Sequence, residues 1–143
     1  MSKHPFAAVQ HAFPNEVESA FRFLVDDFGL EGPEVGGVAL PTIAFVGRGL
    51  RYRIMLDPDD MAVITRVEVE TESKRLVAEL DNLVQAAGLG APNHVKYSAR
   101  TLTALRKALE SQAKYVRLLR PRLVSDTVLQ LMQMANAREW TVR

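Results

Sequence analysis

The chain contains no cysteine among its 143 residues. This absence excludes disulfide bridges, thiolate zinc sites and a cysteine nucleophile, and it favours a reducing compartment over a secreted framework. No stretch approaches the roughly 18 apolar residues of a membrane span, and the first residues lack the continuous apolar segment of a signal peptide. We therefore expect a soluble, cytoplasmic protein that does not contact a membrane.

Residues that commonly carry catalysis are few. The three histidines, His4, His11 and His94, form neither an HExxH pattern nor a pair four residues apart. No serine lies in a GxSxG elbow. We predict a non-catalytic protein with no metal and no cofactor. An enzyme whose site is assembled from scattered residues is the minority alternative, and His94 would be its first candidate.

Two loops resemble ligand-binding motifs but are better explained as turns. The acidic segment 57–60 lacks the spaced ligands, the central glycine and the distal glutamate of a calcium-binding EF-hand loop. Aspartate and proline also favour tight turns for backbone reasons. The segment 47–49 begins like a glycine-rich phosphate loop, but a strand pattern follows it where a helix would be needed.

The chain does have a marked division of charge. Residues 1–92 contain 8 Lys and Arg against 14 Asp and Glu, whereas residues 93–143 contain 10 against 3. The halves cancel to the overall net charge of +1. Opposite fields on two parts of one molecule imply that they face each other, pair with a second copy, or meet two different partners.

Apolar residues at the N-terminal end recur with the spacing of a helix. Pro14 suits the first helical position and Gly29 a C-terminal stop, and residues 5–12 leave room for a preceding turn or short helix. The apolar face between them comprises Val17, Ala20, Phe21, Leu24, Val25 and Phe28. Five of the six phenylalanines lie in the first 28 residues, so we expect this end to be anchored in the core.

The apolar period then changes from 3.6 to 2, which indicates a three-stranded antiparallel meander over 43–46, 50–56 and 63–69. We expect Leu56 to lie opposite Met61, so that Ile54 meets Val63. One face should bury Leu50, Tyr52, Ile54, Val63, Val67 and Val69. The other should carry Arg51, Arg53, Arg66, Glu68 and Glu70.

The glycine-rich segment 31–40 indicates a connection with room for a short extended stretch. The rest of the chain indicates helices. We expect a helix over 71–87, a longer one opened by Ser98 or Thr101 and interrupted at Pro121, and a last one over 124–140 that carries Trp140 near its end. The predicted fold is α+β: an N-terminal helix, the three-stranded meander and three helices that cover one sheet face. It forms a single domain, 1–143, with an acidic helix-sheet part (1–92) and a basic helical part (93–143).

Basic residues of the long predicted helix fall opposite its apolar seam and form a stripe, which we call the basic stripe. An ordinary solvated face is one interpretation, and an anion-binding surface is the other. An acidic protein partner is favoured over nucleic acid, because no aromatic residues are interleaved. The basic stripe comprises Arg106, Lys107, Lys114 and Arg117, with Arg120 and Arg122 around the proline.

The order of patterns in residues 14–87 resembles the YbjN-like and class I type III secretion chaperone-like family of small bacterial proteins. The resemblance lies in FLVDDFGL, IAFVGRGLRYRIMLDPDDMAVITRVEVE and KRLVAELDNLVQAAG. It implies a helix and a curved sheet that hold a partner polypeptide without catalysis, usually in a homodimer. The basic C-terminal part departs from the acidic composition of that family.

The sequence as a whole predicts a non-catalytic bacterial protein that binds another protein as an adaptor, chaperone or assembly component. The partner should present an acidic surface, and a second copy of the chain is a further candidate partner. Two alternatives stay open. One is an immunity protein that neutralises a toxin, and the other is a nucleic-acid-associated protein that uses the basic C-terminal helices.

Overall fold

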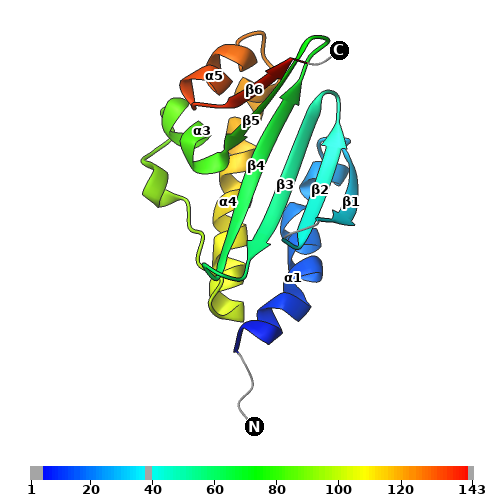
Figure 1. Cartoon of the computed structure of the whole chain (residues 1–143), viewed down its shortest axis with the longest axis vertical. Coiled ribbons are helices and arrows are strands. Elements are labelled where there is room, and N and C mark those ends of the chain that lie inside the picture. The colour runs from blue at the N-terminus through cyan, green and yellow to red at the C-terminus, as the bar shows by residue number, and fades with distance from the viewer. Residues whose placement is uncertain (1–4, 38–39, 142–143) are drawn as a thin grey trace.

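The computed structural model describes residues 5–37 and 40–141, in which six strands form one antiparallel sheet in sequential order. The strands are β1 (Glu31–Gly36), β2 (Thr42–Gly47), β3 (Leu50–Asp57), β4 (Ala62–Glu70), β5 (Lys74–Glu79) and β6 (Arg138–Thr141). The helices are α1 (Pro5–Phe21), α2 (Phe23–Asp26), α3 (Leu80–Ala86), α4 (Leu102–Leu123) and α5 (Val128–Met134), with a 3₁₀ turn η1 (Pro92–His94). Helices α1 and α4 lie side by side behind the sheet in Figure 1.

The predicted α+β class is confirmed, but the predicted three-stranded sheet is wrong. The three predicted strands are β2, β3 and β4. Strand β1 extends the sheet on one side, and β5 and β6 extend it on the other. All three added strands come from segments that the sequence pattern assigned to a connection or to helices.

Strand β1 lies within the predicted connection over 31–40, where the sequence left room for a short extended stretch but did not place it in the sheet. All six of its residues are exposed, so it carries no apolar alternation that would reveal a strand. It is defined by backbone pairing with β2, and its register is irregular between Glu31 and Glu34. Pro33 lies within this irregular segment, which agrees with the restriction of proline to edge strands and bulges.

The predicted helix over 71–87 is half strand and half helix. Its first part is β5, which turns Leu76 and Ala78 toward the core and pairs with β4. Only the second part, α3, is helical and buries Leu80, Leu83 and Val84. The four-residue step from Leu76 to Leu80 fits a helical repeat. Residues 74–79 nevertheless form a strand, because they pair with the long strand β4.

The last predicted helix also ends earlier than expected. Helix α5 stops at Met134, and Asn136 adopts a positive φ of 56°. Asparagine tolerates this left-handed conformation, which commonly ends helices. The chain then returns along β5 as β6, so Trp140 lies in a strand opposite Arg75.

Helix α1 begins at Pro5, so the segment 5–12 is helical and continues without interruption through Pro14, which was expected to start a helix. Pro14 has no N–H to donate to the carbonyl of Gln10, so the helix tolerates one missing bond. The predicted anchoring of this end is confirmed, because the following α1 side chains are buried in the core: Phe6, Val9, Phe13, Val17 and Phe21.

The predicted faces of the central strands are confirmed, although their register is shifted. Leu56 lies opposite Val63 and Ile54 opposite Thr65, two residues away from the predicted pairing. The turn keeps its predicted length of four residues but lies one residue later, at 58–61, because Asp57 still pairs with Ala62. The Asp57 carboxylate accepts the N–H groups of Asp59 and Asp60 and so holds the turn in this position. A shift of two residues leaves every side chain on its predicted face.

Helix α4 joins the sheet to the other helices. Thr101 caps it by accepting the N–H of Ala104, as predicted, but the helix continues through Pro121 to Leu123. The predicted interruption at Pro121 is therefore wrong. Within the described part of the chain, none of the helices is long and apolar enough to cross a membrane.

Candidate functional site

Two arginines of the basic stripe, Arg106 and Arg117, contact acidic residues of the N-terminal half. Arg106 Nε and Nη2 donate to the two carboxylate oxygens of Glu16 at 3.0 and 3.2 Å, and this bond raises the pKa of Arg106. Arg117 lies 3.8 Å from a carboxylate oxygen of Asp27, and its guanidinium stacks 3.9 Å above the Phe23 ring. The acidic and basic halves therefore pack against each other.

The other members of the basic stripe diverge. Lys114 lies 5.3 Å from the Tyr115 ring, and Lys107 is exposed near the start of α4. Arg120 and Arg122 lie in its last turn. The structure thus divides the basic stripe into two arginines that are paired with acidic residues, Arg106 and Arg117, and four members that form no ion pair in the described structure.

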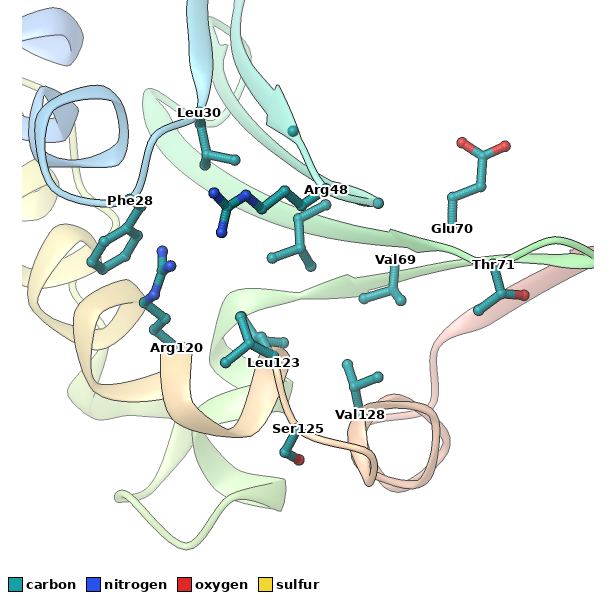
Figure 2. Close-up of a pocket in the computed structure, with 14 residues that line it drawn as sticks. Phe28, Leu30, Arg48, Val69, Glu70, Thr71, Arg120, Leu123, Ser125 and Val128 are labelled. Carbon is teal, nitrogen blue, oxygen red and sulfur yellow. The ribbon is translucent and has the colours of Figure 1, made fainter.

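A pocket of about 480 Å³ lies at the C-terminal end of α4, and we call it the α4-end pocket. It is enclosed by the β2–β3 turn, the end of β4, the segment after α2 and the start of α5 (Figure 2). Its apolar lining comprises Phe28, Leu30, Leu50, Val69, Leu123, Val124 and Val128. Val124 is 59% exposed, so an apolar surface continues outside the pocket.

Arg48 reaches this pocket from the two-residue turn between β2 and β3. Gly47 pairs with Leu50, and the turn residues Arg48 and Gly49 have φ values of 54° and 79°. Such turns favour asparagine followed by glycine. An arginine held in the left-handed region costs roughly 1 kcal/mol or more. A strained arginine at a pocket is a reason to look for a ligand.

Arg120 reaches the same pocket from α4. Its guanidinium stacks 3.8 Å above the ring of Phe28. Tyr52 lies near this group on the core face of β3, and its hydroxyl is buried without a hydrogen-bond partner in the described structure. Burial raises the pKa of Tyr52 to about 12, and the positive charge of Arg120 opposes that shift.

No ion pair in the described ranges involves Arg48 or Arg120. The carboxylate in the lining belongs to Glu70, which points away from the pocket in Figure 2, whereas Arg48 extends toward Phe28 and Arg120. Two guanidinium groups therefore border an apolar pocket without an ion-paired carboxylate in the described structure. This arrangement suits an anionic group attached to an apolar body.

The remaining candidate residues of the sequence lie elsewhere. His94 is exposed at the end of η1 and takes no part in the α4-end pocket. The acidic segment 57–60 belongs to the β3–β4 turn, as predicted, with Asp57 as the last residue of β3 and the turn itself at 58–61. Across residues 5–37 and 40–141, no three His, Asp or Glu side chains gather in an arrangement that could hold a metal ion.

Sequence reasoning included Arg120 but missed Arg48 and Tyr52. A signal for Arg48 was present, since the segment 47–49 was identified as a hairpin turn in which arginine is unusual. Tyr52 was correctly placed on the buried face, but its unpaired hydroxyl requires the packing of α4 to be known.

The chain was compared with protein-family models, curated proteins and solved structures, and none of the three comparisons gave a significant match.

Proposed function

We propose that this protein is a non-catalytic binding protein that holds another protein, and that the partner presents an acidic surface. The α4-end pocket receives a partner carboxylate together with a neighbouring apolar side chain. One observation carries this proposal: Arg48 and Arg120 border an apolar pocket and have no carboxylate partner in the described structure. The predicted resemblance to secretion chaperones stays a prediction.

The pocket combines two sources of binding free energy. A guanidinium binds a carboxylate through two parallel hydrogen bonds, which are about twice as strong as neutral ones. An apolar side chain that enters the pocket gains roughly 25 cal/mol for each Å² of apolar surface removed from water. Arginine and buried apolar anchors also dominate the energetics of protein interfaces.

The proposed partner is a protein because the pocket is small, largely apolar and bordered by only two free cations. Nucleic-acid binding usually requires many phosphate contacts along a basic surface, and two members of the basic stripe, Arg106 and Arg117, are already paired with Glu16 and Asp27. An adaptor, a chaperone and an immunity protein would all use such a site, and the identity of the partner distinguishes them.

The test uses the double variant Arg48→Asn/Arg120→Gln in affinity capture from the native host, with quantitative mass spectrometry. Asparagine is suited to the positive φ at position 48, so the variant removes charge without adding strain there. The control is Arg122→Gln, which removes a charge from the same helical turn but does not line the pocket.

We expect the wild type and the control to capture the same acidic protein in similar amounts. The double variant should capture about 10-fold less of it, or still less. Circular dichroism checks that all three proteins are folded. Equal capture by the double variant would contradict the proposed site. Capture of nucleic acid, with a steep linear fall of log affinity against log salt, would instead support the nucleic-acid alternative.

A further inference from the structure

The sheet face opposite the helices presents five arginines and the only tryptophan of the chain. Figure 1 shows this face turned toward the viewer, with α1 and α4 behind it. The register places the following side chains on this face: Arg51, Arg53, Arg66, Arg75, Arg138 and Trp140, together with Glu34, Glu68 and Glu79.

Two arginines in the centre of this face lie directly opposite each other. Arg53 on β3 pairs in register with Arg66 on β4, and like charges in this position destabilise a sheet. Glu68, whose side chain is only 8% exposed, lies 3.2 Å from Arg53, and Glu79 lies 2.8 Å from Arg66. These carboxylates offset the repulsion and hold both guanidinium groups in place.

The edge of the face adds two more arginines, whose charges are not neutralised by a carboxylate in the described structure. Arg75 lies opposite Trp140, and its guanidinium is 5.4 Å from the centroid of the indole ring. Arg138 precedes Trp140 by two residues and points to the same face. Neither Arg75 nor Arg138 forms an ion pair in the described structure.

A hollow of about 460 Å³ joins the centre of the face to this edge. Arg53, Arg66, Arg75 and Arg138 line it, with Asn82 and Asn136 as further polar groups and Trp140, 43% exposed, as the aromatic wall. Its volume lies within the range of about 300–1,000 Å³ that is usual for small-ligand sites. Four arginines against two carboxylates, Glu68 and Glu79, leave the lining with a net positive charge.

We propose that this hollow binds a nucleotide. The base stacks on the exposed indole of Trp140, and the phosphate groups lie among the arginines. Base stacking on an aromatic side chain tolerates any base, and arginine binds phosphate oxygens in pairs. The asparagine amides provide donors and acceptors for the ribose or the base edge. This proposal is independent of the protein-binding function proposed above, because the two sites share no lining residue.

The single tryptophan provides a direct measurement, since all indole fluorescence comes from the proposed site. We expect adenosine diphosphate to change this fluorescence saturably. Adenosine, which lacks the phosphates, and pyrophosphate, which lacks the ring, should each bind about 10-fold more weakly or worse. Isothermal titration calorimetry on the full chain provides a second measurement of affinity that does not depend on the fluorescence of Trp140.

The decisive variant is Arg138→Gln, because Arg138 is exposed and its loss breaks no ion pair in the described structure. We expect adenosine diphosphate to bind it about 10- to 100-fold more weakly, while folding by circular dichroism is unchanged. Arg22→Gln, in the helical layer, is the matched control and should bind like wild type. Trp140→Leu should weaken binding in calorimetry by about 10-fold.

Several results would overturn the proposal. The absence of a saturable fluorescence change at millimolar adenosine diphosphate would show that the hollow does not bind a nucleotide. Equal affinity for adenosine diphosphate and adenosine would show that the arginines do not bind phosphate. Equal affinity for pyrophosphate would show that Trp140 does not bind a base. Much tighter binding of a short oligoadenylate, steeply dependent on salt, would assign the hollow to single-stranded RNA instead of a free nucleotide.

Discussion

The clearest test of the packing between α4 and the sheet is the substitution Gln112→Met. Gln112 is only 1% exposed, and its side chain makes three hydrogen bonds. Its Oε1 accepts the hydroxyl of Thr65 at 2.6 Å, and its Nε2 donates to the carbonyl oxygens of Val63 at 2.8 Å and Lys96 at 2.9 Å. One amide therefore connects α4, β4 and the segment that precedes the helix.

Methionine has a similar length and volume, so the change removes the hydrogen bonds and leaves little cavity. A typical hydrogen bond contributes about 1 kcal/mol net, and a buried group left without its partner costs about 1–3 kcal/mol. With the Thr65 hydroxyl and two carbonyl groups losing their partner, we expect the free energy of unfolding to fall by about 2–4 kcal/mol. Urea denaturation followed by circular dichroism measures this change.

A double-mutant cycle with Thr65→Val separates the network from general damage to the core. In the wild type, this substitution should cost about 1–2 kcal/mol, because it leaves the Gln112 oxygen without its donor. In the Gln112→Met background it should cost almost nothing, since the hydroxyl has already lost its acceptor. Additive effects, or a loss below about 1 kcal/mol for Gln112→Met alone, would refute the reasoning.

Two further predictions concern buried side chains of β3. Burial raises the pKa of Tyr52 to about 12, above the value of about 10 in the unfolded chain. The folded state therefore binds the proton more tightly, and its stability should fall as the pH rises from about 10 through 12. Tyr52→Phe should remove that part of the alkaline loss and cost little at neutral pH, as checked by urea unfolding at about pH 8 and about pH 11. Ile54 is fully buried, so Ile54→Ala should lower the unfolding free energy by about 2–5 kcal/mol, and a loss below about 1 kcal/mol would contradict its place in the core.

The central part of the fold could be predicted because each strand carries its own signal. Strands β3 and β4 alternate apolar and polar residues, and their faces follow from that alternation alone. The cap at Thr101 could likewise be predicted from local residue preferences. The register could not, since it depends on where the turn begins: Asp57 pairs with Ala62 as the last residue of β3, and its side chain accepts backbone N–H groups of the turn that follows.

The added strands could not be placed in the sheet from the sequence because backbone pairing, not side-chain pattern, defines them. Strand β1 is exposed throughout and β6 has only four exposed residues, so neither shows a buried face. Strand β5 does bury Leu76 and Ala78, but the same residues also fit a helical repeat. The unpaired edge of β4 decides between the two, because a long strand with free N–H and C=O groups favours a pairing neighbour.

The candidate site depends on which arginines form no ion pair once the chain is folded. The charge division of the sequence indicated that the two halves could face each other, but it could not identify these arginines. The two halves do face each other: Arg106 and Arg117 bind Glu16 and Asp27 across the contact of α4 with α1 and α2. A count of charges cannot distinguish these neutralised arginines from Arg120, three residues further along the same helix. Arg120 is set apart because Arg48, more than 70 residues earlier, extends from a strained turn to the same pocket. The surplus charge available to a partner is therefore a property of the tertiary packing, and neutralising Arg48 and Arg120 should affect binding more than neutralising Arg106 and Arg117.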